Sequence, residues 1–202
     1  MVRRIVLCLL CMAPLVLPGQ RASAQFNVEW EYPEEYIQFV PIGATLALPL
    51  TGVKAENPFL DRFFALGIGF GSEVVIVQSL KYLVNEQRPD GSAGFSFPSA
   101  HAATAFLGAE LVRHEYGWGW GAGAYALAAS TAVLRVCHDR HYWWDCVAGA
   151  GIGVLCANIG YWMLDPVKKF LGIRTDADLP VSVAPAYDPY SGAICGSLAL
   201  RF

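Results

Sequence analysis

Five apolar stretches of helical length dominate the sequence, and a chain with this pattern has few ways to fold. They cover residues 36–53, 63–84, 101–116, 120–136 and 143–164, and short polar connectors with Pro or Gly separate them. Only 15% of the 202 residues are charged, against roughly 25% in an average soluble protein, and 20 glycines allow helices to pack closely. We therefore expect one all-α domain, a bundle of about five transmembrane helices.

The first 24 residues have the form of a secretory signal peptide. Arg3 and Arg4 precede an apolar run over residues 5–17, and a small-x-small pattern ends at Ala24. A run of this length is short of the roughly 20 residues that cross a hydrocarbon core. We expect a cleaved signal peptide over 1–24, and the alternative is an uncleaved first membrane span. In both cases residue 25 emerges on the exported side.

The cations outside the apolar stretches predict one orientation. If the helices alternate in direction from the exported side, one set of basic residues falls in the cytoplasm: Lys54, Arg62, Arg113, His114, Lys168, Lys169 and Arg174. The loops 81–101 and 135–145 then share the opposite face. We expect a multi-pass membrane protein, of the bacterial inner membrane, whose active site faces the periplasm or exterior.

The tail over residues 173–202 differs from the domain over 25–172. Apolar and polar residues alternate at 181–183 and again at 194–202, which predicts a short β-hairpin. The last residues resemble the terminal strand of an outer-membrane barrel, but two strands cannot close a barrel. We therefore expect the tail to be a packing appendage.

Charge and cysteine content exclude two classes of protein. A net charge of −3 gives no cationic field for nucleic acid. The four cysteines beyond the signal segment show no zinc-ligand spacing. Cys137 and Cys146 flank a polar loop, where they form either a disulfide or two small apolar packing residues; the second interpretation is favoured.

Three polar clusters lie at the predicted helix ends on the exported face. Lys81 is followed seven residues later by Arg88-Pro89, a Pro-Ser-Ala-His sequence covers 98–101, and Arg135 precedes His141 and Asp145. Together they supply cations, a hydroxyl, two imidazoles and a carboxylate. A tetrahedral phosphate dianion requires such charge-assisted donors, together with a nucleophile and an acid. The pattern points to phosphoryl transfer.

In order and spacing, these clusters resemble the three-part signature of the type 2 phosphatidic acid phosphatases, which share a fold with vanadium haloperoxidases. The resemblance runs from about residue 63 to 164, as K-x6-RP, PSxH and R-x5-H-x3-D. Ala100 stands where that family usually has Gly, and Leu134 where it usually has Ser. The first change affects a backbone donor to phosphate, and the second removes a supporting hydroxyl.

The resemblance implies a role for each matching side chain. His141 would be the nucleophile that becomes a phosphohistidine, Asp145 would orient its ring, and His101 would be the general acid and then the base. Four side chains would bind the phosphate oxygens: Lys81, Arg88, Ser99 and Arg135. The resemblance implies no metal and no other cofactor, because the cations supply the electrostatic stabilisation.

Each polar group also has a purely structural interpretation. Taken singly, Lys81 and Arg88 are typical interface residues, Arg135 with Asp145 a helix-end ion pair, and Ser99 a helix cap. The structural interpretation is favoured for Glu73, an acid within the second apolar stretch. Other groups near His141 have secondary expected roles: His138, Asp139 and Arg140 in shaping the entrance, and Tyr142, Trp143 and Trp144 in an interfacial aromatic belt.

The expected function is a membrane phosphatase that hydrolyses a monoester or diphosphate on a lipid. Polyprenyl diphosphate, phosphatidylglycerol phosphate and a lipid A phosphate are examples. The alternatives are an acid phosphatase for soluble monoesters, a vanadate-dependent peroxidase and a non-catalytic interaction protein. The expected partners are the phosphorylated lipid and membrane lipids; the sequence does not specify head group or oligomeric state.

Overall fold

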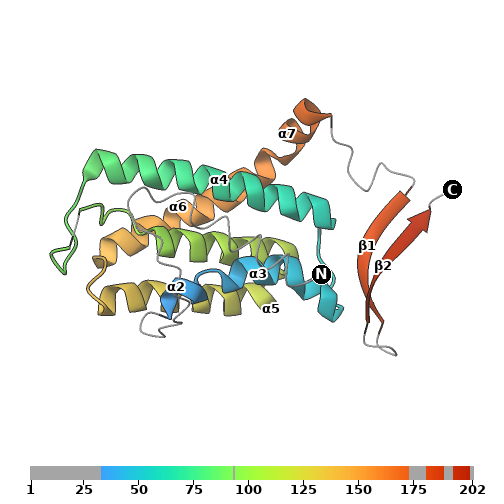
Figure 1. Cartoon of the computed structure of the whole chain (residues 1–202), viewed down its shortest axis with the longest axis horizontal. Helices are drawn as coiled ribbons and strands as arrows, with labels where there is room; N and C mark the ends of the chain where they lie inside the picture. The colour runs from blue at the N-terminus through green and yellow to red at the C-terminus, as the bar shows by residue number, and fades with distance from the viewer. Residues whose placement is uncertain (1–32, 93, 173–180, 189–192, 201–202) are drawn as a thin grey trace, which may run out of the picture. The chain divides into compact units, whose positions relative to one another are not determined.

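The computed structural model describes residues 33–92, 94–172, 181–188 and 193–200. The predicted signal segment lies outside these residues. The described residues belong to one compact unit, Tyr32–Phe202, which is built on long helices (Figure 1).

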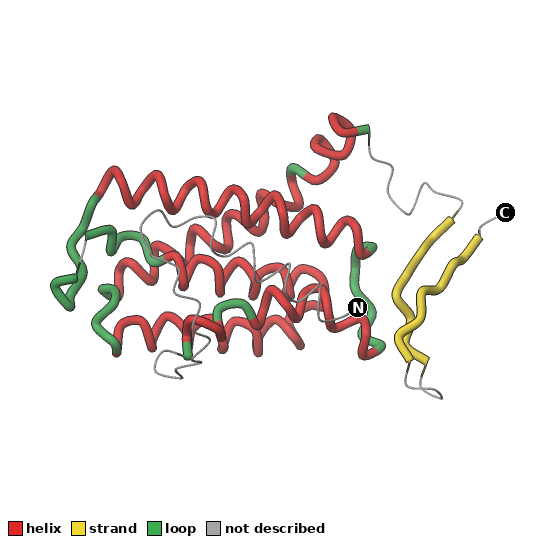
Figure 2. Tube along the Cα trace, in the orientation of Figure 1, coloured by secondary structure: helices red, strands yellow, loops and turns green. Residues whose placement is uncertain are grey.

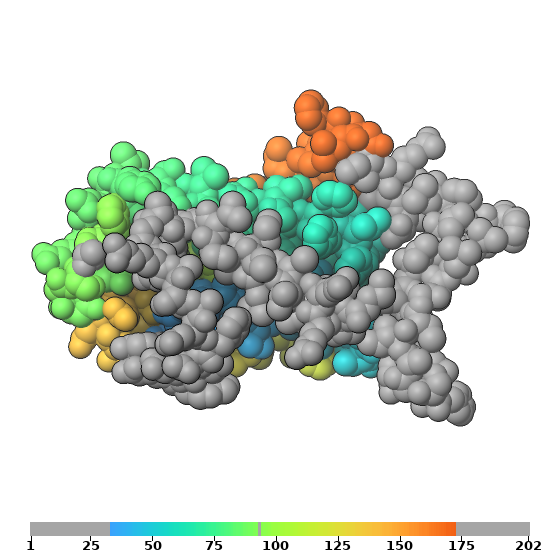
Figure 3. Space-filling model, in the orientation of Figure 1, coloured from blue at the N-terminus to red at the C-terminus, as the bar shows by residue number. Residues whose placement is uncertain are grey.

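Three long helices form the body of this unit: α4 (Phe59–Val84), α5 (Ala100–Cys137) and α6 (Trp143–Trp162). They are preceded by the short helices α2 (Glu34–Ile37) and α3 (Val40–Ala47) and the 3₁₀ turn η2 (Leu48–Thr51). The helix α7 (Leu164–Leu171) follows α6 at a 46° bend. It lies at the surface beside α4 (Figure 3), and Phe170 on it is 89% exposed.

A continuous helix over 36–53 was a wrong prediction. The stretch is divided into α2, α3 and η2, and Pro41 and Pro49 lie in the first turns of α3 and η2. Proline lacks an N–H and its ring clashes with the preceding turn, so a helix readily begins at proline but does not run through it. Gly52, with φ of 89°, ends the segment in the left-handed region.

The long α5 is two helices joined at Gly117. This residue has φ 73° and ψ −176°, a conformation that only glycine adopts without strain. The two halves are antiparallel: they appear as green and yellow helices in Figure 1, and Figure 2 shows the long helices of the bundle side by side. The Phe106 and Tyr125 rings lie 5.8 Å apart, and Gly121 packs on Arg113. The predicted separate helices over 101–116 and 120–136 correspond to these halves.

Glycines on α6 fix its place in the bundle. A Cβ atom at Gly149 would overlap the carbonyl oxygen of Ser99, the N-cap of α5, and one at Gly153 would overlap that of Ala103 on α5. A Cβ atom at Gly160 would overlap the carbonyl oxygen of Ala65 on α4. Small residues let helix backbones approach this closely. The contact of Gly149 with Ser99 therefore brings the N-terminal ends of α5 and α6 together.

Among the described residues, α4 is the one helix that is long and apolar enough to span a membrane. If α6 and α7, which are joined at a bend, are counted together as one span, the number of candidate spans is two. The expected number of five spans stays a prediction.

In the tail, β1 (Val181–Asp188) pairs antiparallel with β2 (Ala193–Leu200), from Val181 opposite Leu200 to Asp188 opposite Ala193.

Candidate active site

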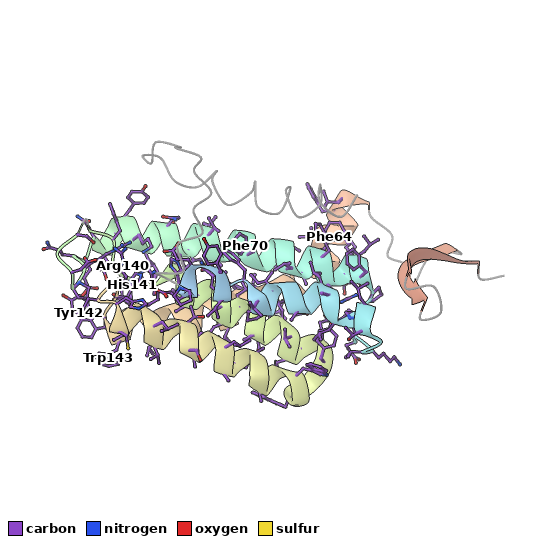
Figure 4. All side chains as sticks on the ribbon, turned by 60° about the horizontal axis from the view of Figure 1, so that its bottom comes forward. Phe64, Phe70, Arg140, His141, Tyr142 and Trp143 are labelled. Atoms are coloured by element: carbon purple, nitrogen blue, oxygen red, sulfur yellow. The ribbon has the colours of Figure 1, made fainter. Side chains whose placement is uncertain are left out.

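Two loops meet at one end of the bundle, between α4 and α5 and between the second half of α5 and α6 (Figure 1). Figure 4 shows His141 at this end, with Arg140 and Tyr142 beside it. Hydrogen bonds join the loops: Asp90 N donates to Asp139 O at 3.1 Å, and Arg140 Nη1 to Asp90 Oδ2 at 3.3 Å. The polar clusters, up to 64 positions apart in sequence, therefore share one site.

His141, Asp145 and Ser96 form a buried triplet. Ser96 Oγ donates to Asp145 Oδ2 at 2.5 Å, and this carboxylate oxygen lies 3.5 Å from His141 Nδ1. Ser96 Oγ lies 3.4 Å from the same ring nitrogen, and Tyr142 N donates to Asp145 Oδ2 at 3.0 Å. The acid and the hydroxyl thus hold the Nδ1 edge of the imidazole, which leaves Nε2 for chemistry.

The imidazole of His141 is neutral in this setting. Burial, together with the positive charges of Arg135, Lys81 and Arg88, lowers its pKa from 6.5 to about 2. A neutral ring keeps a lone pair on one nitrogen at physiological pH. The arrangement therefore supplies a nucleophile surrounded by cations.

The cations reach the site from three places. Lys81 lies in the last turn of α4, and its Nζ donates to Phe95 O at 2.7 Å. Arg88 lies in the following loop. Arg135 is in the last turn of α5 and is 3% exposed. Within the described part of the chain, the Nε atoms of Arg88 and Arg135 are buried without a hydrogen-bond partner. Buried, unsatisfied guanidinium donors are well suited to oxygens of a bound anion.

Ser99 and His101 complete the predicted set at the start of α5. Ser99 is the buried N-cap, and its Oγ accepts from Ala102 N at 3.4 Å. Its own N–H donates to Asp145 O at 3.0 Å, which joins the second cluster to the third. The His101 ring nitrogen Nε2 lies 3.8 Å from Glu35 Oε1. All seven predicted site residues lie at this end of the bundle.

Sequence reasoning missed three polar residues of this site: Ser96, Glu34 and Glu35. The Glu34 side chain is fully buried, with Oε1 2.8 Å from His138 Nδ1 and 3.6 Å from Arg135 Nη1. These contacts join residues about a hundred positions apart, and no spacing rule detects them. For Ser96 the only available signal was its place three residues before Ser99.

Several residues outside the predicted catalytic set contact other protein side chains. Glu73 is buried and accepts weakly from Thr104 Oγ1 at 3.4 Å, in agreement with its structural interpretation. Trp143 is 64% exposed, and Trp144 stacks on Tyr142 with 4.5 Å between ring centroids. Cys137 and Cys146 are free thiols and do not form a disulfide with each other. The favoured interpretation as apolar packing residues holds for Cys146, which is buried, but not for Cys137, which is exposed.

The comparison with protein families agrees with this geometry. The sequence model of the PAP2 superfamily matches residues 62–169, more than half of the chain. The chain belongs to the PAP2 superfamily.

Two curated relatives are lipid A 1-phosphatases. The one from Porphyromonas gingivalis is 34% identical over 137 residues, which cover 65% of this chain and 31% of the relative. The one from Helicobacter pylori is 22% identical over 134 residues, 64% of this chain and 70% of the relative. The chain thus spans about a third of the length of the first relative.

A solved structure shares the fold. The crystal structure of Aquifex aeolicus LpxE superposes with a TM-score of 0.50 and 24% identity, over 63% of this chain and 82% of that chain. The fold of this chain is therefore shared with a protein of known structure.

Proposed function

We propose that this protein is a membrane phosphatase that removes a phosphate group from a lipid at the exported face of the membrane, through a phosphohistidine on His141. The observation that carries the proposal is the neutral His141 imidazole, held by Asp145 and surrounded by Lys81, Arg88 and Arg135. A neutral nucleophile among cations is the arrangement that transfer of a phosphoryl dianion needs.

The reaction would proceed in two steps. His141 Nε2 attacks phosphorus with its lone pair; an N–P bond forms and the bond from phosphorus to the lipid oxygen breaks. Burial and the cations Arg135 and Lys81 lower the pKa of His101 to about 3 in the empty site. We therefore infer that His101 takes up its proton when the phosphate dianion binds beside it, because the negative charge favours the imidazolium, and then gives this proton to the lipid oxygen. Water then attacks phosphorus while His101 takes its proton, the N–P bond breaks and inorganic phosphate leaves. Lys81, Arg88, Arg135 and Ser99 would stabilise charge on the phosphoryl oxygens in both steps.

The exposed surface around the site supports a lipid substrate. Large apolar side chains surround this end, with Tyr82 67%, Leu83 80% and Trp143 64% exposed. A soluble protein does not usually gather such groups around a phosphate site, whereas a lipid headgroup brings apolar chains with it. The names of the two curated relatives favour the 1-phosphate of lipid A among the lipids considered.

The distribution of charge supports a site facing the periplasm. Cations predicted for the cytoplasmic side share the opposite end of the bundle: Lys168 Nζ lies 3.2 Å from Asp61, and Arg62 Nη1 donates to Tyr116 at 2.9 Å. Together with a signal-like N-terminus, this separation favours a multi-pass inner-membrane protein with both catalytic loops outside.

Phosphate release from a panel of substrates tests the proposal. The full chain, purified in detergent, is offered lipid A 1-phosphate, a polyprenyl diphosphate and a soluble aryl phosphate at equal concentration, with and without EDTA. We expect lipid A 1-phosphate to be hydrolysed fastest, vanadate to inhibit and EDTA to have no effect. Preference for the soluble ester would indicate an acid phosphatase, and loss of activity in EDTA would overturn the assignment of phosphate binding to the three cations.

A further inference from the structure

An acidic side chain from outside the three motifs lies within the proposed phosphate site. Glu35 Oε1 is 3.5 Å from Arg135 Nη1 and 3.8 Å from His101 Nε2. These two partners come from different motifs, and both are groups that the proposed reaction places against the phosphate. A carboxylate oxygen therefore lies where an oxygen of the substrate would be expected.

Glu35 is held loosely, in contrast to its neighbour Glu34. The Glu35 side chain is 53% exposed, and both of its contacts are longer than a hydrogen bond. The Glu34 side chain is fully buried and lies 2.8 Å from His138 Nδ1. Glu34 is thus a fixed counterion of Arg135, whereas Glu35 can rotate into solvent at little cost.

The supporting element is small. Helix α2 has four residues and packs against α5, which carries both His101 and Arg135. Because the backbone at Glu35 is anchored by its buried neighbour, only the Glu35 side chain has to move when the site fills.

We propose that Glu35 is an affinity-determining residue of the active site, whose carboxylate occupies the anion position between Arg135 and His101 until phosphate displaces it. The inference rests on the proposed function for the identity of the displacing ligand. No bond forms or breaks in this exchange, since one anion replaces another beside the same two groups. The carboxylate lowers the apparent affinity for every anionic ligand without taking part in the chemical step.

Competition of this kind has a distinctive signature. When a fraction of the sites is closed by Glu35, the apparent dissociation constant of any ligand rises by the same factor, whatever its charge. If the Glu35 carboxylate only repelled anions, the repulsion energy would be twice as large for a dianion as for a monoanion. The affinity for the dianion would then fall by about the square of the factor for the monoanion. If Glu35 binds Arg135 and His101 as strongly as a typical partly exposed ion pair, closing the site in this way raises the apparent dissociation constant about two- to sixfold.

The experiment measures binding of sulfate, a dianion, and dimethyl phosphate, a monoanion, by calorimetry on the full chain in detergent. The variants are Glu35→Gln and Glu35→Ala, and the control is Glu56→Gln, which removes one exposed charge at the opposite end of the bundle. We expect both Glu35 variants to bind both anions about two- to sixfold more tightly, by equal factors, and Glu56→Gln to bind as the wild type does.

Hydrolysis of lipid A 1-phosphate, measured on the same samples, separates this inference from the proposed function. Tighter anion binding by the Glu35 variants without hydrolysis by any sample would support the role of Glu35 and overturn the proposal that lipid A 1-phosphate is the substrate. Normal hydrolysis with unchanged anion affinity in both Glu35 variants would overturn the role of Glu35 alone. A gain confined to sulfate, or an equal gain in Glu56→Gln, would also overturn it.

Discussion

At the scale of single residues, the protonation state of His141 decides whether the site can work. Burial and three neighbouring cations bring its pKa to about 2 in the folded protein, from 6.5 in an unperturbed histidine. We therefore expect the ring to be neutral at pH 6, which ¹⁵N chemical shifts of the imidazole report directly. A protonated His141 at pH 6 in the ligand-free protein would contradict the account.

The same shift predicts how stability depends on pH. Between pH 6.5 and pH 2 the unfolded chain binds a proton at His141 and the folded chain does not, so stability falls as the pH drops below 6.5. The slope from this group is up to about 1.4 kcal/mol per pH unit. In His141→Gln, which cannot titrate, we expect a smaller decrease in melting temperature between pH 7 and pH 5 than in the wild type. Equal decreases in the two proteins would rule this out.

Local spacing in the sequence predicted seven site residues, because PAP2 motifs place them at helix ends. It could not predict Ser96 or the two acids of α2, whose contacts exist only once distant segments have packed. Glu34 meets Arg135 across a separation that no periodicity encodes. Motifs thus predicted which side chains meet at this end of the bundle, whereas the residues that contact them from other segments could be found only in the folded chain.

At the scale of helices, glycines on α6 hold the catalytic end together. We expect Gly153→Ala to destabilise the fold by about 1–3 kcal/mol, because its Cβ would overlap the Ala103 carbonyl oxygen across the α5 interface. Gly151→Ala is the matched control, since a Cβ there meets nothing within 4 Å. Thermal unfolding of both variants in detergent measures the difference; equal melting temperatures would show that the close packing does not matter.

Helix prediction succeeded where apolar runs lacked proline and failed where they contained it. The runs that became α4 and α6 contain no proline, and the glycine turn in α5 agreed with the predicted break. The first run includes Pro41 and Pro49, which divide it into separate helices. Because the run is apolar throughout, hydrophobicity alone predicted one continuous helix. That interruption creates α2, which carries the two acids near Arg135.

For the whole molecule, a site that faces the periplasm requires one orientation in the membrane. Ser92 is exposed in the loop between α4 and α5. We expect Ser92→Cys, in a background without native cysteines, to react with a membrane-impermeant maleimide in intact spheroplasts. Thr51→Cys, exposed at the opposite end of the bundle, is the control and should react only after lysis. The reverse pattern would place the catalytic loops in the cytoplasm.

Phosphate release from lipid A 1-phosphate by His141→Ala tests whether His141 accepts the phosphoryl group. We predict a loss of more than about 10³-fold in turnover with unchanged helical content by circular dichroism, and a smaller loss for Asp145→Asn, which only orients the ring. Phosphate release at the wild-type rate by a folded His141→Ala protein would contradict the mechanism.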